Sequence, residues 1–451
     1  MIPEYPMIRF GIAGIPLTSK GRTFIDSVED AHFLGLNSLE IQLLRVNLEQ
    51  IPATDYVGMT PKDVETSIVV NILRPDEDGN YVSIGGESVI EENDILQELF
   101  WNMATNYAEI AEGGALAKEL DLELSIHAPY YMDMLRENEV AQRSYDHLKW
   151  TMFIGRAMGA KHVVTHTGFY NKDKKTSINS AIKVFSSIVN EMPKSKNYPI
   201  LGIETSGKKE IFGTIDDIIS VLKKVPSAEP IVNLAHIHSI TGGSLLEVKD
   251  FEAVMEKFKK YSKDELYVEF SGVEYEDHNE VKLTPIKQGD LKFETFSEYL
   301  VEDDYDYNII SSSPLLEHDA QYMNLILLRS LSRSIQRKET AKKHSRLVET
   351  MVREYPVKKG KKIDTQTIEK VAKEILGQAK ISNGHVITKT PGIAKIDLSS
   401  DGKKLFVTTE TEKDSKDAEN AIKLYNKLID SLTGYSSKKN YSNGRVCSGL
   451  S

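Results

Sequence analysis

Four side chains able to bind a metal ion stand at the ends of four β-like runs. The runs read SIHAP, VVTHTG, GIETSG and VNLAHIH, and they deliver His127, His166, Glu204 and His236 at intervals of 39, 38 and 32 residues. Neutral imidazole and carboxylate suit Zn(II), Mn(II) or Fe(II). Such an ion would polarise a phosphoryl or carbonyl oxygen and lower the pKa of a bound water. The four runs therefore predict a metal-dependent or hydrolytic site.

Glu269 in the run YVEFSG is a further candidate, because it could point into the same space. His238 lies two residues beyond His236, and its direction past the end of a strand is open. A single histidine at a strand end commonly does no more than form hydrogen bonds. Ligand-type residues at four equivalent positions favour a metal site instead, with Glu204 and Glu269 as the expected catalytic carboxylates.

Three residues beside these runs could contact a nucleic acid. Tyr130 and Tyr131 follow His127 closely, and adjacent aromatic rings on a loop can stack on bases or wedge into a duplex. Packing within the loop is the alternative for both tyrosines. Arg45 follows another β-like run and could meet a phosphate. We therefore expect these three residues on the rim of the site as DNA-binding residues.

Eight β-like runs alternate with helical patterns and would position these residues. The runs are 8–14, 38–44, 123–129, 162–168, 200–206, 230–236, 265–272 and 307–314. Alternation predicts an α/β fold with a parallel sheet covered by helices, and eight units predict a (β/α)8 TIM barrel. The active site of such a barrel lies at the carboxyl ends of its strands. A doubly wound open sheet is the alternative, but it gathers residues from four successive strands less readily.

The chain is expected to contain more than the barrel. The barrel would span residues 1–325, with an insertion at about 46–110 that includes a hairpin or loop at 76–89 and a long helix at 95–120. A basic helix and linker (326–362), a small α+β domain (363–436) and a flexible tail (437–451) would follow.

The composition limits which cellular compartment and which binding partners we expect for the protein. No run of about 18 apolar residues occurs, so no membrane span is expected, and the N-terminus shows no signal peptide. The one cysteine, Cys447, excludes a disulfide within the chain and a Cys-based zinc site, so the cytoplasm is the expected compartment. The net charge of −11 argues mildly against a nucleic-acid-binding protein, which usually carries a basic surface. Residues 329–362, however, carry 12 Lys and Arg against three Glu, which predicts either a solvated helix or a phosphate-contacting segment.

The ordered set SIHAPYYMDM, VVTHTGFY, GIETSG, NLAHIH, FSGVEY and SSSPLLEHDA resembles the endonuclease IV family of the xylose isomerase-like barrels, especially its archaeal members. The resemblance covers roughly residues 5–325. It implies cleavage of DNA 5′ to an abasic site by a trinuclear metal cluster, usually of zinc. It also implies that His127, His166, Glu204 and His236 are metal ligands and that Tyr130 helps to hold the opened abasic site.

The sequence departs from this family over about half of the cluster. Asn233 stands where the family has an Asp, and Glu269 stands where it has a His. The family's Asp-x-His pair falls on Val281 and Leu283, and its bridging Glu falls on Ser312. We therefore expect a reduced site with one or two divalent ions, zinc by resemblance, or with none.

The leading interpretation is a DNA-repair enzyme that cleaves phosphodiesters at abasic or damaged-base sites of double-stranded DNA with a reduced metal cluster. Three alternatives stay open: a DNA glycosylase or AP lyase with metal-independent chemistry, a metal-dependent sugar isomerase or epimerase, and a non-catalytic DNA-binding protein. A lyase needs an amine near the pocket, for which Lys161, Lys208 and Lys282 are candidates by position. A sugar enzyme predicts a small closed pocket.

The small C-terminal domain resembles one half of a TATA-binding-protein fold over the stretch AKIDLSSDGKKLFVTTETEKDSKDAENAIKLYNKLIDSL. The resemblance implies a curved sheet that binds DNA or a protein partner. A generic ββα unit is the alternative.

Overall fold

Eight parallel strands close into a barrel in the first of two units of the chain. The computed structural model describes residues 6–192, 197–350, 352–411, 418–436 and 446–447, and it divides into Met1–Ser332 and Arg333–Ser451. The barrel strands are β1 (Ile8–Ala13), β2 (Ser38–Gln42), β7 (Glu123–His127), β8 (His162–Thr165), β9 (Ile200–Glu204), β10 (Ala228–Asn233), β11 (Glu265–Phe270) and β14 (Asp306–Ser311). They pair in the order β1-β14-β11-β10-β9-β8-β7-β2, which confirms the predicted (β/α)8 barrel.

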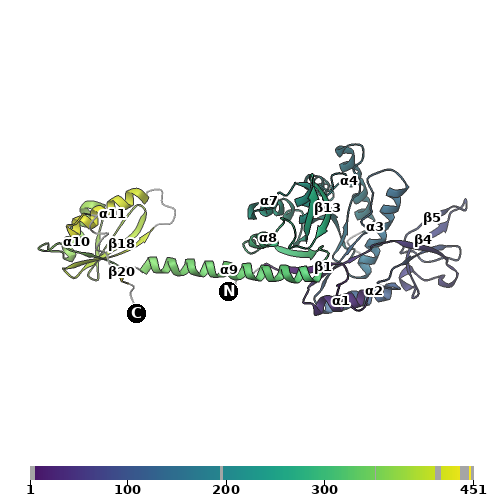
Figure 1. The fold of residues 1–451 in the computed structure, drawn as a ribbon, viewed down its shortest axis with the longest axis horizontal. Coiled ribbons are helices and arrows are strands. Elements are labelled where there is room, and N and C mark those ends of the chain that lie inside the picture. Colours follow the sequence, from purple (N-terminus) through teal and green to yellow (C-terminus); the bar gives the residue numbers. More distant parts are fainter. Residues whose placement is uncertain (1–5, 193–196, 351, 412–417, 437–445, 448–451) are drawn as a thin grey trace. The chain divides into compact units, whose positions relative to one another are not determined.

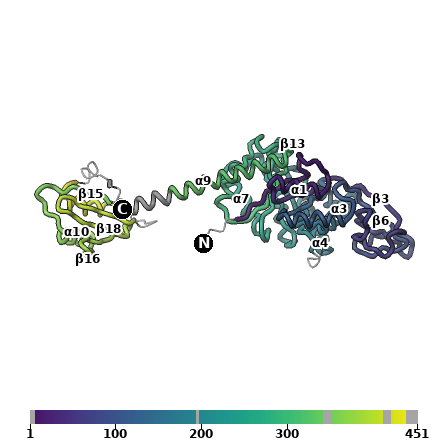
Figure 2. Tube along the Cα trace, turned by 90° about the horizontal axis from the view of Figure 1, so that it is seen from below, coloured from purple at the N-terminus to yellow at the C-terminus, as the bar shows by residue number. Residues whose placement is uncertain are grey.

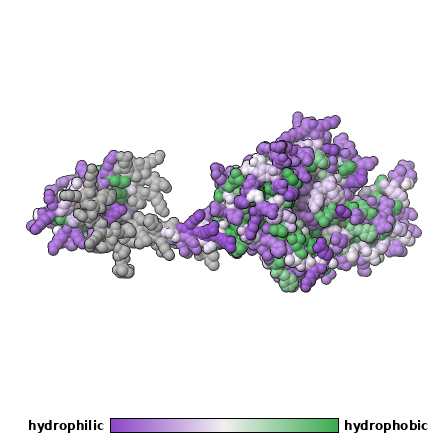
Figure 3. All heavy atoms as spheres, viewed as in Figure 1, coloured by the Kyte–Doolittle hydropathy of each residue, from purple (hydrophilic) through white to green (hydrophobic). Residues whose placement is uncertain are grey.

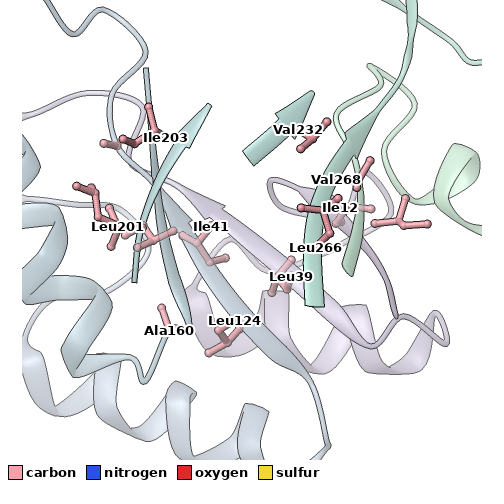
Figure 4. Close-up of a cluster of buried hydrophobic side chains, with 14 of the residues drawn as sticks. Ile12, Leu39, Ile41, Leu124, Ala160, Leu201, Ile203, Val232, Leu266 and Val268 are labelled. Carbon is pink, nitrogen blue, oxygen red and sulfur yellow. The ribbon is translucent and has the colours of Figure 1, made fainter. Parts of the chain in front are cut away.

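Helices cover the outside of this barrel (Figure 1). They are α1 (Phe24–Phe33), α2 (Tyr107–Glu119), α3 (Glu139–Ala157), α4 (Lys174–Glu191), α5 (Ile215–Leu222), α7 (Val248–Lys259), α8 (Phe293–Leu300) and the first part of α9 (Glu317–Thr350), up to Ser332, where the barrel unit ends. Aliphatic side chains such as Leu39, Leu201 and Val268 are fully buried, and Figure 4 draws them on the strands. Another buried group includes Ile231, Tyr267 and Ile310. The strands therefore read as nearly continuous apolar runs, as expected for a sheet buried on both faces.

Strand pairing brings particular residues to the same level at the carboxyl end of the barrel. Gln42 pairs with His127 on β7, and Asn233 pairs with Glu269 on β11. Glu204, the last residue of β9, pairs with Ile231. Side chains separated widely in sequence therefore meet at one mouth.

An antiparallel sheet fills the insertion after β2. Its strands β3 (Asn47–Pro52), β4 (Ile68–Pro75), β5 (Tyr81–Ser83) and β6 (Ile95–Phe100) pair in the order β3-β6-β4-β5 around a small core of their own. Figure 2 shows β3 and β6 at one end of the barrel unit. The Tyr107 hydroxyl on α2 donates to Val69 O at 3.3 Å, which ties this sheet to the barrel.

Part of the insertion differs from the sequence prediction. Residues 76–89 do form part of a hairpin, since they contain β5, which pairs with β4 just before them. The long helix predicted at 95–120 is wrong at its start, because 95–100 form β6, which pairs with both β3 and β4. The helix begins only at Tyr107, after Asn106 accepts a hydrogen bond from Glu109 N at 2.9 Å as an N-cap.

Two smaller elements shape the mouth. The predicted run 230–236 is strand only to Asn233, whose side chain accepts a hydrogen bond from His236 N at 3.2 Å and starts α6 (Leu234–Ile240). His236 therefore lies in a helical turn and not at a strand end. A hairpin of β12 (Gly272–Glu276) and β13 (Asn279–Thr284) follows β11. Its turn places Asp277 and His278 at positive φ, as tight hairpin turns require.

The second unit is an α+β domain. Strands β15 (Val352–Pro356), β16 (Lys380–Ser382), β17 (His385–Thr390), β18 (Ile393–Ser400), β19 (Lys404–Thr411) and β20 (Val446–Cys447) form one antiparallel sheet, with helices α10 (Thr365–Leu376) and α11 (Ala418–Thr433). Ile368 and Leu428 of the helices share a buried core with Ile396 and Leu398 of the sheet.

Two details of this unit bear on the sequence predictions. Residues 352–356, expected within the linker, form β15 because they pair with β19. Apart from β20, the predicted tail at 437–451 lies outside the described residues. The resemblance to half of a TATA-binding-protein fold stays a prediction.

The face of the barrel unit seen in Figure 3 is mostly hydrophilic, with hydrophobic residues in small groups. Of the helices in the described ranges, none combines the length and the apolar character that crossing a membrane requires.

Candidate functional site

Three predicted ligands converge at the mouth of the barrel. His127 Nε2 lies 3.1 Å from Glu204 Oε2, and His166 Nδ1 lies 3.2 Å from the same oxygen. One donor atom of each residue lies within 4.8 Å of the other two. We call these residues the donor cluster. They come from the end of β7, the loop after β8 and the end of β9, as their spacing in the sequence predicts.

The donor set fits a divalent metal ion. Two imidazoles and a carboxylate are the protein ligands of many catalytic zinc sites, which keep a further position open. Nδ1 of His127 is hydrogen-bonded to the carbonyl oxygen of Ala128, so Nε2 is the nitrogen turned toward Glu204. A backbone contact of this kind is what fixes the tautomer and direction of metal-binding histidines. The cluster is thus a His/Glu group that could hold a metal.

Burial and neighbouring groups set the protonation of the cluster. Burial alone would raise the pKa of Glu204, but the imidazoles of His166, His127 and His236 hold it well below its ordinary value. Burial lowers the pKa of His166 to about 4, against the charge of Glu204. Burial would also lower the pKa of His127, yet hydrogen bonding to Glu204 and the charge of Glu40 raise it to about 9. Glu204 is therefore an anion at neutral pH, and His166 is neutral.

His236 lies on the other side of Glu204, and it does not belong to the three-donor group found in the described chain. Its Nδ1 lies 3.2 Å from Glu204 Oε1 and 2.7 Å from Thr205 O, while its Nε2 lies 3.1 Å from Glu280 Oε2. Burial alone would lower its pKa, but the contacts with Glu204 and Glu280 raise it to about 9. A Cβ at Gly207 would lie 2.5 Å from Glu280 Oε2, so the glycine leaves room for this carboxylate.

In the opposite half of the mouth, the uncharged amide of Asn233 links two carboxyl groups. Asn233 Nδ2 donates to Glu204 Oε1 at 3.0 Å and to Glu269 Oε2 at 3.1 Å. Burial, together with the charges of Glu204 and Glu40, raises the pKa of Glu269 well above its ordinary value. Burial also raises the pKa of Glu40, whose Oε2 accepts a hydrogen bond from the Tyr267 hydroxyl at 2.7 Å. Burial therefore shifts the pKa of Glu40 and of Glu269 upward, whereas the neighbouring imidazoles hold the pKa of Glu204 low.

The predicted rim residues lie around two separate hollows. A pocket of about 200 Å³ contains Tyr130, His166 and His236 in its wall. The Tyr130 ring lies 6.1 Å from that of His127 and is 53% exposed, so it is available to a ligand. The Tyr131 hydroxyl accepts a hydrogen bond from Val46 N at 3.2 Å. Arg45 lines a larger groove on the side of β1 and β2.

Other candidates have different surroundings. Lys161 Nζ lies 3.2 Å from Glu123 Oε2, at the amino ends of β7 and β8, and so it is at the wrong end of the barrel for a lyase amine. Lys282 pairs with Glu274 on the hairpin at 2.9 Å. Of the three lysines, Lys208 alone lines the pocket of His166.

His238 and Glu317 are bound to other parts of the protein. His238 Nε2 lies 3.0 Å from Asp290 Oδ1. Glu317 accepts hydrogen bonds from Leu17 N and Thr18 N, each at 2.9 Å, so it holds the loop after β1.

Sequence reasoning missed two carboxyl groups of the site. Glu280 was overlooked because the family pattern directs attention to Val281 and Leu283. The segment EYEDHNEVKL carries a hairpin signal, polar turn residues between alternating runs, that could have placed Glu280 near the mouth. Glu40 lies inside the barrel on β2, and only its alternation with Ile41 hints at that direction.

Comparison with known proteins relates the chain to barrel proteins of several activities. An uncharacterized protein of Methanocaldococcus jannaschii is 26% identical over 254 residues, which cover 53% of this chain and 92% of that protein. Endonuclease IV from Thermus thermophilus has 17% identity and a TM-score of 0.46, over 71% of this chain and 99% of its own. A D-tagatose 3-epimerase-like protein has 19% identity and a TM-score of 0.42, over 51% and 85%. Structural similarities this low carry no argument about activity.

Family models match both units. Residues 352–442 match a domain of unknown function, DUF5611. Residues 92–320, just over half of the chain, match the model described as xylose isomerase-like TIM barrel. The closed barrel of eight parallel strands agrees with that match, and the chain belongs to the family of xylose isomerase-like TIM barrels.

Proposed function

We propose that this protein acts on DNA at abasic or damaged-base sites, by metal-assisted cleavage of a phosphodiester at the donor cluster. The observation that carries the proposal is the convergence of His127, His166 and Glu204 within 4.8 Å of one another at the barrel mouth. The ordered motifs that resemble endonuclease IV supply the substrate class. A reduced site of one or two ions matches the replacement of other family ligands by Asn233 and Ser312.

The residues of the mouth have distinct roles in this proposal. His127, His166 and Glu204 would hold the metal, with His236 as a further ligand or as a cationic neighbour of Glu204. A bound ion would polarise a phosphoryl oxygen and lower the pKa of a water. Glu269, whose pKa is raised by burial and by the nearby carboxylates, would be a proton donor inside the site. Asn233 positions Glu269 relative to Glu204 through its two hydrogen bonds.

Contact with DNA is assigned to residues on the rim. The exposed ring of Tyr130 stands beside His127, where it could stack on an unpaired base or sugar. Tyr131 and Arg45 extend this rim, and the guanidinium of Arg45 suits a phosphate.

Duplexes with a single defined lesion test the proposed function. The panel holds an abasic site, modified bases and an undamaged control, each incubated with added zinc or manganese and with a chelator. We expect strand cleavage or tight binding at one lesion, lost on chelation and in His166→Ala. His32→Ala, which changes an exposed histidine on α1, is the matched control and should act like the wild type. No cleavage and no lesion preference under any condition would refute the proposal.

A sugar isomerase or epimerase is the second candidate, and the size of one pocket favours it. The pocket of about 200 Å³ beside His166 and His236 could enclose a monosaccharide, and Glu204 and Glu269 lie on two sides of Asn233. Incubation of the metal-loaded protein with ketohexoses, followed by chromatography, separates the candidates. Epimer formation without DNA cleavage would replace the first proposal with the second.

A further inference from the structure

A second hollow lies at the mouth, on the side of β1 and β2. This mouth groove has a volume of about 810 Å³, and its wall includes Arg22, Gln42, Arg45, Asn47, Phe100 and Trp101. These residues come from the loop after β1, the end of β2 and the inserted sheet with its exit. Arg22 and Arg45 lie outside the residues 92–320 that match the family model, whereas Phe100 and Trp101 lie within them.

Hydrogen bonds hold the walls of the mouth groove in place. Glu317 binds the backbone of the β1–α1 loop, Phe24 N donates to Met103 O at 2.7 Å, and Val46 N donates to the Tyr131 hydroxyl at 3.2 Å. Each bond joins segments far apart in sequence. The groove is therefore formed before any ligand arrives, which reduces the entropic cost of binding.

The chemistry of the wall combines cationic and apolar surface. Arg22 and Arg45 are both exposed, and within the described ranges neither guanidinium has a carboxylate oxygen within 4.0 Å. Leu17, Leu44 and Phe100 also line the groove, and they are exposed by 53%, 51% and 53%. Exposed apolar side chains gathered beside two available guanidinium groups mark a surface for an anion that carries a flat or apolar body.

We propose that the mouth groove binds one nucleotide unit, with the phosphate on Arg22 and Arg45 and the base against Phe100. Guanidinium groups bind phosphate through paired hydrogen bonds, and an aromatic face accepts any base by stacking. The amides of Gln42 and Asn47 offer donors and acceptors to the edge of the base. The inference rests on the proposed action on DNA, since that action brings a nucleotide strand to this end of the barrel.

Strand pairing connects the mouth groove to the donor cluster. Gln42, which lines the groove, is the residue of β2 that pairs with His127 on β7. It lies two residues after Glu40, so both side chains project on the same side of β2. A strand lying in the groove would thus pass next to the cluster, and a neighbouring nucleotide could reach it.

Binding of a labelled single-stranded DNA decamer to the full chain, followed by fluorescence anisotropy at fixed salt, tests the groove. Arg22→Ala and Arg45→Ala should each weaken binding by roughly tenfold, the usual effect of losing one charged hydrogen-bonded contact. Arg143→Ala is the matched control, because this exposed arginine on α3 pairs with Glu139, and its effect should stay within about twofold. Wild-type binding by both groove variants would overturn the proposal.

Competitors separate the possible sources of the nucleotide unit. The decamer is challenged with dTMP, deoxyribose 5-phosphate and inorganic phosphate. Competition by dTMP well above that of the two others supports a site for phosphate and base together, and equal competition by all three refutes it. A dTMP affinity greater than that of the decamer would identify a free nucleotide as the ligand, whereas a tighter decamer identifies a strand.

A local reporter shows where the ligand lies and keeps the two proposals apart. The chain has two tryptophans, so in Trp150→Phe the emission comes from Trp101 in the groove wall. Addition of dTMP or decamer should change this emission saturably, and an unchanged emission would contradict the location. If nucleotide binding depends on the arginines but no lesion is cleaved or preferred, the groove stands and the proposed function falls.

Discussion

The two halves of the barrel mouth use similar residue types for different purposes. Around β7, β8 and β9, His127, His166 and Glu204 bring their donor atoms within 4.8 Å of one another. Around β10 and β11, an amide joins the Glu204 anion to Glu269, a carboxyl group that favours its protonated form. The first half gathers donor atoms that could hold a cation. The second half links two carboxyl groups through one amide, and Glu269 Oε1 is buried there without a hydrogen-bond partner among the described residues.

Protonation explains how these halves coexist. Buried like charges cannot all ionise at short distance, so a proton or a metal must compensate them. In the first half, imidazoles hold the pKa of Glu204 low. In the second half, Asn233 carries no charge, and its amide nitrogen donates to both Glu204 and Glu269. The amide thus joins Glu269 to Glu204 through one hydrogen bond to each carboxyl group.

Replacing Glu204 with Gln should have the largest effect. The amide cannot supply the anion that both His127 and His166 face, so metal affinity should fall by more than roughly 100-fold, since loss of a residue that merely orients a ligand costs about 10–100-fold. Metal per chain after gel filtration gives the readout. Glu40→Gln is the matched control, because Glu40 is a buried glutamate of the same barrel that is not one of the three donors, and it should retain metal. Equal metal loss in both variants would contradict the assigned division of charge.

Asn233→Asp should make the half of the mouth around β10 and β11 more like the half around β7, β8 and β9, with a carboxylate able to bind a metal ion. The change places a carboxylate where the amide now contacts Glu204 and Glu269 at 3.0 and 3.1 Å, and the repulsion and lost donors should cost about 1–3 kcal/mol without metal. With zinc present, we expect one additional ion per chain and recovery of stability. Urea unfolding with and without zinc, together with metal analysis, measures both.

Asn308→Asp provides the control for that variant. Asn308 Nδ2 donates to Glu123 Oε1 at 2.8 Å at the other end of the barrel. The substitution should also lower stability, but zinc should not restore it. An Asn233→Asp protein that loses stability in the same way at every zinc concentration would show that the second half has no room for an ion.

The donor cluster was predictable because regular strands fix direction. In a parallel barrel the carboxyl ends of all strands lie at one mouth, so the sequence intervals of His127, His166 and Glu204 were sufficient to group them. His236 follows a different rule. Its run is apolar like a strand, yet the Asn233 side chain caps a helix there, and hydrophobicity alone does not reveal that cap.

Contacts between residues far apart in the chain could not be predicted from the sequence alone. Glu280 reaches His236 only because a hairpin folds back over Gly207, and nothing local to Glu280 encodes that distance. The helix predicted from residue 95 failed for a related reason. Its first six residues contain Leu, Gln and Glu, which suit a helix, but pairing with β3 and β4 makes them a strand.

Glu280→Gln should separate His236 from the donor cluster. Loss of the charge 3.1 Å from His236 Nε2 should lower the pKa of that imidazole from about 9, since the charge of Glu280 helps to raise it. Metal affinity at the cluster should change by less than about tenfold, below the effect of losing a ligand. Histidine signals in an NMR pH titration give the pKa, and Glu274→Gln on the same hairpin serves as control. A large loss of metal in Glu280→Gln would make this carboxylate a ligand.

Glu317→Gln should have the smallest effect, confined to acid pH. Burial alone would raise the pKa of Glu317, but hydrogen bonds from the backbone of Leu17 and Thr18 lower it below its ordinary value. A carboxyl group with a lowered pKa in the folded state stabilises the fold above its unfolded pKa, and this stabilisation disappears as the pH falls through the folded pKa. At pH 7 the variant should therefore be less stable by about 1 kcal/mol, the scale of one such hydrogen bond.

That difference should shrink between about pH 5 and 3, because the wild type loses the charge that the variant never had. Urea unfolding across this range measures the trend, and a difference that stays constant would contradict it. The result bears on the two halves, because Glu317 follows β14, which pairs with β11 in the second half and with β1 beside the mouth groove. A carboxylate that holds the loop after β1 in place also holds Leu17 in the wall of the mouth groove, so its charge would contribute to the shape of the proposed binding surface.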